Sequence, residues 1–479
     1  MKKERIEKAL DYISDEKLAE ALEEKKKKHT FRWVSAVAAV LAVAITVTAL
    51  VWPVSTPAPG IRPPAMQAAG LVAAPEYPQM AKYPLDPNSP GGYEEYEKWW
   101  DSQRAQYGQP LGYGDNLYGF YQKSIPVFLQ GGEKNAVYSP VNVYMALAML
   151  AETADGSTRQ QILDALNASS IESLRTQASH MWNAHYCDDD ATTLLLANSL
   201  WLDDTLNYKQ ATADILAKDY YASVFHGDLG SDAMNKALQD WLNENTGGLL
   251  KEQVAGQTMD PQTLLALAST IYYKVKWNNE FWEELNTEDI FHAPSGDKTV
   301  TYMNTCLTYG PYYYGEDYGA VSLRLEDGSR MWLILPDEGY TPADVLKSGH
   351  AVKDLLVEGE PANNTSVMVN LSLPKFDVTA KNDIIPALKT IGITDAFSSY
   401  TADFSSVSDD PLFVSGAEHA ARVKIDEKGL EAAAYTVLID AGAAMPPTEE
   451  VDFILDRPFI FLIESASDMP LFTGVVNEP

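Results

Sequence analysis

The sequence predicts an α+β fold behind an N-terminal membrane anchor, and three features support this prediction. A charge-free apolar run lies near the N-terminus, a proline-rich segment follows it, and the remaining chain mixes strand-like with helix-like patterns. These features divide the chain into a cytoplasmic tail (1–32), a transmembrane helix (33–52), a proline-rich and aromatic linker (53–110) and one continuous α+β domain (111–479).

The apolar run extends from Trp33 to Trp52 and contains 20 residues without a charge, which is enough to span a bilayer. Tryptophan at both ends suits the two membrane interfaces, and four consecutive lysines, 25–28, precede the run. The positive-inside rule therefore places the tail in the cytoplasm and the chain after residue 53 outside the cell. A cleaved signal peptide is the alternative, but its apolar core is usually about 7 to 15 residues long.

The segments that flank the anchor carry weaker signals. The tail has apolar side chains at helical spacing, which suits a solvated tail or a docking site for a regulatory partner. It loosely resembles the cytoplasmic ends of bacterial single-span regulators. Residues 53–90 contain ten prolines and predict an extended, semi-rigid linker. The aromatic residues of 93–114 predict a helix packed on the following domain, with a glycan-binding stripe as the alternative.

The composition limits the classes of partner. The formal net charge is −31, which argues against nucleic acid or glycosaminoglycan as a ligand, because both require clustered lysine and arginine. Hydrophobic residues make up 46% of the chain, so a sizeable core is expected. Only two cysteines occur, Cys187 and Cys306, and two buried free thiols are expected rather than a disulfide framework.

No motif of a common enzyme class is present, and no catalytic residue, cofactor or metal is predicted. His180, His185 and Cys187 lie close together in the sequence. Histidines five residues apart do not share a helix face, however, and no second pair of ligands follows.

The segment from Val423 to Thr436 is the most informative part of the chain. It begins as an alternating strand, is interrupted by Gly429 and continues with the small residues Ala432, Ala433 and Ala434. Small residues without a strong preference for helix or strand suit a loop that is exposed in one state and forms a buried strand in another. An inserted strand must fit between close-packed neighbours, which favours small side chains.

Many separate sequence blocks are distinctive between residue 111 and residue 479. They are Asn135–Pro140, Met145–Leu150, Leu194–Trp201, Ile271–Trp277, Met331–Pro336, Leu371–Phe376, Gly392–Phe397, Asp456–Phe459 and Leu471–Gly474. In their identity and order these blocks resemble the serpin family. The resemblance implies three β-sheets, about nine helices and an exposed reactive loop. It also implies a monomer that inhibits serine proteases as a suicide substrate: the protease cleaves the loop, the loop inserts into the main sheet, and the acyl-enzyme is trapped.

The resemblance assigns the hinge of this loop. Its residues are Glu427, Gly429, Leu430, Glu431, Ala432, Ala433, Ala434 and Thr436. Strand alternation places Leu430, Ala432, Ala434 and Thr436 on one face, which would point into the core after insertion. The family usually has threonine or serine at the position of Leu430, and a bulky residue there could slow insertion and convert an inhibitor into a substrate.

The reactive bond is expected between Ala443 and Ala444, about fourteen residues after Gly429, with an uncertainty of one residue. No lysine or arginine occurs from Leu430 to Asp456, which excludes a trypsin-like target. Small residues before the bond favour an elastase-like or subtilisin-like serine protease, with a papain-like cysteine protease as the alternative. The predicted membrane topology makes this target extracellular.

The resemblance also implies a polar cluster beneath the sheet that controls its opening. Its members here are Ser139, Asn142, Ser269 and His419, and the serine and asparagine at 142 and 269 are exchanged relative to the usual pattern. We expect Asn142 to supply the amide that Ser269 lacks and to keep His419 hydrogen-bonded. Two function classes stay open: a membrane-tethered protease inhibitor, and a non-inhibitory binding module with the same fold.

Overall fold

The computed structural model describes residues 69–84, 91–110, 112–114, 117–129, 134–260, 262–357, 364–430 and 449–479. The predicted tail, the predicted transmembrane helix (33–52) and the reactive loop from Glu431 to residue 448 lie outside these ranges. Within the described ranges, no helix is both long and apolar enough to cross a membrane.

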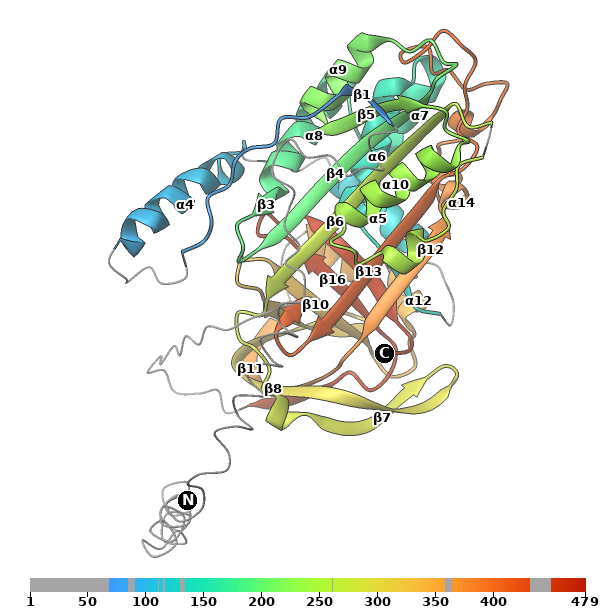
Figure 1. Ribbon diagram of the computed structural model, residues 1–479. Helices are drawn as coiled ribbons and strands as arrows, with labels where there is room; N and C mark the ends of the chain where they lie inside the picture. The colour runs from blue at the N-terminus through green and yellow to red at the C-terminus, as the bar shows by residue number, and fades with distance from the viewer. Residues whose placement is uncertain are drawn as a thin grey trace, which may run out of the picture. The chain divides into compact units, whose positions relative to one another are not determined.

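The first of two sheets has eight strands in the order β1-β5-β4-β6-β14-β13-β12, in which β3 also pairs with β4 (Figure 1). Among the described strands of this sheet, β4 and β5 alone pair in parallel, and the chain between them includes a helix, α9. The strands are β1 (Gly70–Ala73), β3 (Cys187–Asp188), β4 (Thr193–Asp203), β5 (Ala222–Gly227), β6 (Leu265–Lys276), β12 (Asp377–Asp383), β13 (Glu418–Asp426) and β14 (Gly429–Leu430).

A second sheet has nine strands in the order β15-β11-β8-β9-β10-β16-β17-β2, with β7 paired to β8. They are β2 (Ala136–Tyr138), β7 (Thr287–Ala293), β8 (Gly296–Tyr314), β9 (Tyr318–Arg324), β10 (Arg330–Pro336), β11 (Asn364–Pro374), β15 (Glu450–Ile454), β16 (Phe459–Glu464) and β17 (Pro470–Val476). Three separate sheets were expected, but hydrogen bonds connect the described strands into two. The reason is that β8 is 19 residues long and pairs with β7, β11 and β9 in turn.

The described residues contain eleven α-helices, more than the nine or so expected. One of them, α4, precedes the predicted domain, and α11 and α13 are only about one turn long. The helices are α4 (Gly92–Tyr107), α5 (Leu117–Phe128), α6 (Pro140–Thr153), α7 (Gly156–Ala165), α8 (Ile171–His185), α9 (Gln210–Asp219), α10 (Asp232–Glu244), α11 (Lys251–Val254), α12 (Pro342–Ser348), α13 (His350–Val352) and α14 (Ile385–Thr390). Short helices of other types are η2 (Glu283–Leu285), η3 (Lys353–Val357) and η4 (Asp395–Phe397).

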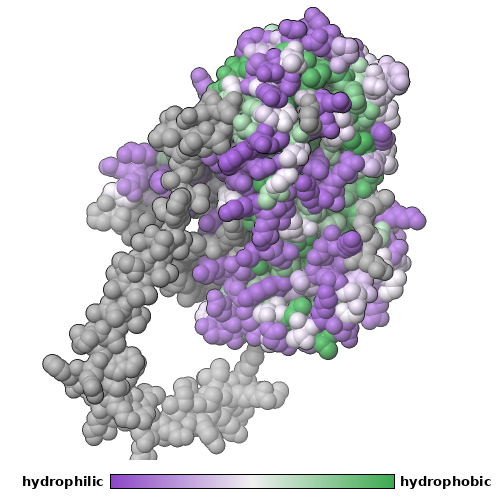
Figure 2. All heavy atoms as spheres, turned by 45° about the vertical axis from the view of Figure 1, so that its right-hand side comes forward, coloured by the Kyte–Doolittle hydropathy of each residue, from purple (hydrophilic) through white to green (hydrophobic). Residues whose placement is uncertain are grey.

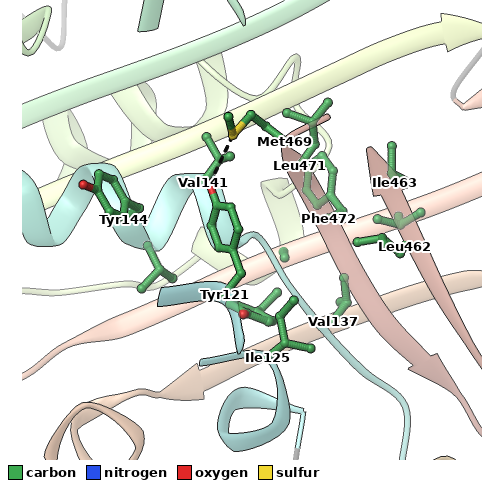
Figure 3. Packing of buried hydrophobic residues seen from close by; sticks show 14 of the residues in the cluster. Tyr121, Ile125, Val137, Val141, Tyr144, Leu462, Ile463, Met469, Leu471 and Phe472 are labelled. Carbon is green, nitrogen blue, oxygen red and sulfur yellow. Dashed lines mark hydrogen bonds between the residues drawn. The ribbon is translucent and has the colours of Figure 1, made fainter. Parts of the chain in front are cut away.

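Helix α6 lies in the core and contacts both sheets, through β6 and β17. Ser139 caps its first turn and Pro140 occupies the first helical position, a combination that favours helix initiation. Every residue of α6 except Ala146 is buried. Figure 3 shows its residue Val141 among apolar side chains of α5 and β17, where the Tyr121 hydroxyl donates to the Met469 sulfur at 3.7 Å.

Helix α10 covers the other face of the eight-stranded sheet, in front of β4 and β6 in Figure 1. Strand alternation separates the two faces: Leu200 joins the main core, whereas Trp201 packs in a second cluster with Phe225 and Trp241. The Trp201 and Phe225 rings stack with centroids 4.4 Å apart. The sheet is therefore enclosed by an apolar layer on each face.

Part of the segment expected to be a linker is packed on the domain. Strand β1 pairs with β5 and extends the sheet at its edge. The Tyr77 ring then stacks on Trp182 and Tyr186 of the α8 region, with centroids 5.4 and 5.5 Å away. We call residues 69–84 the strap.

Asp189 fixes both the strap and α4. Its backbone oxygen accepts a hydrogen bond from the Tyr83 N–H at 2.8 Å. Its carboxylate accepts from Trp99 Nε1 of α4 at 2.7 Å. The helix expected in the aromatic segment 93–114 is thus present as α4, and it packs on α8.

We expect Tyr77→Ala to lower the free energy of unfolding of the full-length chain by about 1 to 2 kcal/mol, because an aromatic stack and its buried area are lost. Urea unfolding followed by fluorescence measures this change. Tyr93→Ala is the matched control, since Tyr93 is on α4 and is 67% exposed. Equal stability of the two variants would show that the strap does not contribute to the fold.

Candidate functional site

The hinge begins where β13 reverses direction. Strand β13 ends at Asp426, two residues form a turn, and the chain returns as β14. Leu430 pairs with Ile425 of β13 on one side and with Val275 of β6 on the other. The first two residues after the turn therefore already lie between β6 and β13 as the start of a strand.

Backbone hydrogen bonds hold this turn against the end of β6. The Trp277 N–H donates to the Lys428 carbonyl at 2.9 Å, and the Phe281 N–H donates to the Glu427 carbonyl at 2.8 Å. The Trp277 indole also donates, to the Asp426 carbonyl at 2.8 Å. Each carbonyl of the turn residues is thus satisfied by the segment that follows β6.

Gly429 is required by its close approach to β6. Its φ is +148°, which favours glycine, and a Cβ built on it would lie 2.4 Å from the Val275 carbonyl oxygen. A larger residue would displace β14 from its place between the two strands.

Leu430 is only 4% exposed and belongs to the main core, so its side chain points inward. Period-two alternation from this residue would place Ala432, Ala434 and Thr436 on the same inward face if the strand continued. Among the described strands, β14 alone lies between β6 and β13. This is the position in the sheet that an additional strand would occupy.

Glu427 is the buried polar anchor of the turn. Burial alone would raise the pKa of its carboxyl, but the ion pair with Lys375 and the hydrogen bond from Asn286 outweigh it and hold the pKa below the usual value. The charged carboxylate therefore connects the hinge to Lys375, which lies between β11 and β12, and to Asn286, which follows η2.

The structure brings together Ser139, Asn142, Ser269 and His419, from α6, β6 and β13. Asn142 Nδ2 donates to Ser269 Oγ at 2.9 Å, and the Asn142 N–H donates to Ser139 Oγ at 3.2 Å. The amide of residue 142 thus reaches Ser269 on β6.

The partner of His419 differs from the expected one. His419 Nε2 accepts a hydrogen bond from the Ser139 backbone N–H at 3.1 Å, whereas the Asn142 side-chain amide donates to Ser269. Burial lowers the pKa of His419 to about 4, so the ring is neutral near pH 7 and can accept this bond. Helix α6 is therefore tied to β6 by Asn142 and to β13 by Ser139.

Several residues of this site were missed in the sequence. Asn198 Oδ1 on β4 accepts from Ser269 Oγ at 2.8 Å, while its amide donates to the Tyr220 carbonyl at 2.9 Å. Lys375 and Asn286, the partners of Glu427, were also missed. In the sequence, Asn198 directly follows the apolar run Leu194–Ala197. A polar residue that continues an apolar strand indicates a buried amide whose hydrogen bonds are satisfied.

The remaining predictions have mixed outcomes. Ala443, Ala444 and hinge residues from Glu431 onward lie outside the described residues. Both cysteines are free, as expected, but they are not buried: Cys306 is exposed and Cys187 is intermediate. No group of three or more potential metal ligands is found within the described ranges.

We expect Asn142→Ala to lower the free energy of unfolding by about 1 to 3 kcal/mol, because Ser269 Oγ loses its amide donor at a partly buried site. Differential scanning calorimetry of the full-length chain measures this. Asn183→Ala is a control, since Asn183 makes amide hydrogen bonds at a partly buried site away from the cluster. An unchanged melting temperature for Asn142→Ala would contradict the assigned role.

We also expect His419 to make stability depend on pH. Exposed histidine titrates near 6.5, so between about pH 6.5 and 4 the unfolded chain binds a proton that the folded chain excludes. Stability should therefore fall with decreasing pH in this window, by up to about 3 kcal/mol from this group.

Urea unfolding at a series of pH values tests this expectation. In His419→Gln, the free energy of unfolding should decrease less between about pH 6.5 and 4 than in wild type. His292→Gln is the control, because Asp297 raises the pKa of His292 and its contribution has the opposite sign. An unaltered pH profile in His419→Gln would be the contrary result.

Comparison with known proteins identifies the architecture around this hinge. The model of the serpin family (serine protease inhibitor) matches residues 126–479. Alpha-1-antiproteinase 2 of Equus caballus is 30% identical over 361 residues, which are 73% of this chain and 83% of that protein. Leukocyte elastase inhibitor of Sus scrofa is 30% identical over 357 residues, covering 72% and 93% of the two chains.

Solved structures agree. The native state of tengpin, a thermophilic serpin, matches with a TM-score of 0.68 and 26% identity over 77% of this chain and 95% of that chain. Thyroxine-binding globulin in complex with thyroxine matches with a TM-score of 0.65 over 76% and 99%, and its 23% identity shows the fold alone. A family model that spans most of the chain, together with relatives at 30% identity, shows that the chain belongs to the serpin family.

Proposed function

We propose that the chain is a suicide-substrate inhibitor of extracellular serine proteases that prefer small residues, of the elastase or subtilisin type. The observation that most supports this proposal is that Gly429 and Leu430 pair with both β6 and β13 as the first residues of a strand. A strand that has already started needs only to be extended when the loop is released. Protease inhibition in general agrees with the names of the relatives, alpha-1-antiproteinase and leukocyte elastase inhibitor.

The proposed reaction uses the protease's own nucleophile. The nucleophile attacks the carbonyl carbon of Ala443, the bond to the Ala444 nitrogen breaks, and that nitrogen leaves with a proton supplied by the protease. The protease is then held as an ester on Ala443. The inhibitor contributes no catalytic group, only a loop whose insertion is faster than hydrolysis of that ester.

The free energy for trapping would come from the sheet. Each residue inserted after Leu430 would add backbone hydrogen bonds to the facing edges of β6 and β13 and bury alternate small side chains. The residues from Leu430 to Leu438 carry one charge, Glu431, on the outward face, and the segment from Glu431 to Met445 contains no proline. Leu430, the bulky residue that raised the alternative of a non-inhibitory module, is already accommodated in the core.

The location of this activity is part of the proposal. Residues 33–52 would anchor the chain in a cell membrane with residues 1–32 in the cytoplasm, so that the described domain protects an outer surface. No cofactor is required by this mechanism, and the partner is the target protease.

Incubation of the full-length chain with an elastase-like protease, followed by a denaturing gel, tests the proposal. A covalent band at the summed mass, with cleavage after Ala443 or a neighbouring residue, is expected. Cleavage without that band would favour the binding-module alternative.

A pair of loop variants separates insertion from cleavage. Ala434→Arg places a charge on the inward face and should abolish the covalent band while leaving cleavage intact, because burying an unpaired charge opposes insertion. Ala433→Arg places the same charge on the outward face and should retain the band. If both variants behaved alike, the register set by Leu430 would be wrong.

A further inference from the structure

An exposed apolar surface lies beside the hinge. Trp282 is 71% exposed and Leu285 is 53% exposed, at the start and the end of the η2 segment. The Leu285 N–H donates to the Trp282 carbonyl at 2.9 Å, which is the hydrogen bond of a 3₁₀ turn. Trp282 is the extended N-cap residue of this turn and Leu285 is its last residue, so the two exposed side chains flank one short segment. We call residues 282–285 the η2 surface.

The η2 surface is attached to the hinge at both of its ends. Before it, the Phe281 N–H donates to the Glu427 carbonyl at 2.8 Å. After it, the Asn286 amide donates to the Glu427 carboxylate. Glu427 is two residues before Gly429, so the position of this surface is fixed relative to the base of the reactive loop.

Acidic side chains surround the two apolar ones. Glu283 and Glu284 are exposed, and neither forms an ion pair within the described residues. Glu288 follows on β7, where it accepts a hydrogen bond from the Thr301 hydroxyl at 2.5 Å. The face of the molecule in Figure 2 is largely hydrophilic, and its apolar areas are small and scattered. Among the described residues, Trp282 is the most exposed tryptophan, and the carboxylates beside it are not neutralised by ion pairs.

The geometry points to a docking surface for the target protease, which we infer to have an apolar spot within a basic rim next to its active site. This inference rests on the proposed function, because a protease bound to the loop would stand above the hinge. A second copy of this chain fits less well, since it would bring acidic side chains against acidic side chains at a net charge of −31.

Such a surface would select among proteases with the same primary specificity. Small residues at the reactive bond admit many enzymes, whereas a Trp282 contact surrounded by carboxylates favours those with complementary charge. Charged rims act mainly on the rate of association and are screened by salt, and a central aromatic contact contributes affinity.

The test compares full-length wild type with the double variant Trp282→Ala/Leu285→Ala, using a basic elastase as the protease. The second-order rate constant of covalent complex formation should fall about tenfold, with an unchanged stoichiometry and melting temperature. Glu283→Gln/Glu284→Gln should slow association about threefold at low ionic strength and leave it unchanged at high ionic strength. Tyr400→Ala is the matched control, since Tyr400 is 96% exposed near η4, which packs on α7.

A rate constant equal to that of wild type in both double variants would overturn the inference. If the apolar variant loses stability, the glutamine variant decides, because it leaves the packing unchanged. Self-association of wild type that the apolar variant abolishes would identify a second copy as the occupant and would also overturn it. If wild type itself forms no covalent complex, the proposed function fails and the inference fails with it.

Discussion

The account depends on one steric and hydrogen-bonding constraint, the placement of Gly429 against the end of β6. A side chain at this position would meet the Val275 carbonyl oxygen, so only glycine lets β14 lie between β6 and β13. The carbonyls of Asp426, Glu427 and Lys428 are bonded to Trp277 and Phe281, which fixes the turn that feeds this strand. Two residues of a new strand are therefore part of the fold before any protease arrives.

Helices α6 and α10 pack on the two faces of the eight-stranded sheet, and the contacts of α6 with β6 and β13 must adjust if β14 is extended. Helix α6 is bonded to β6 through Asn142 and Ser269 and to β13 through Ser139 and His419, so it bridges the two edges from below. Helix α10 covers the opposite face with its own apolar cluster. The strap, by contrast, pairs with the outer edge of the sheet at β5 and packs on the α8 region, away from the position between β6 and β13.

The sequence allowed prediction of features that depend on local pattern. The serpin architecture follows from recognisable blocks in the family's order. Strand alternation predicted an inward Leu430 only for the inserted loop, and the hydrogen bond from Asn142 to Ser269 was not predicted. Features that depend on long-range geometry were missed. The pairing of β1 with β5, the continuity of β8 across two expected sheets and the Ser139 N–H as the donor to His419 involve backbone groups, which residue identities do not specify. Asn198, Lys375 and Asn286 were missed for a related reason, because their partners are distant in the chain.

The most direct measurement is the unfolding temperature of the full-length chain before and after its reactive loop is cut by a protease. If Gly429 and Leu430 begin a strand that the freed loop extends between β6 and β13, the cut protein should unfold at a much higher temperature than the intact one. An unchanged or lower unfolding temperature after cleavage would contradict this account, because the loop would then have no stabilising place in the sheet.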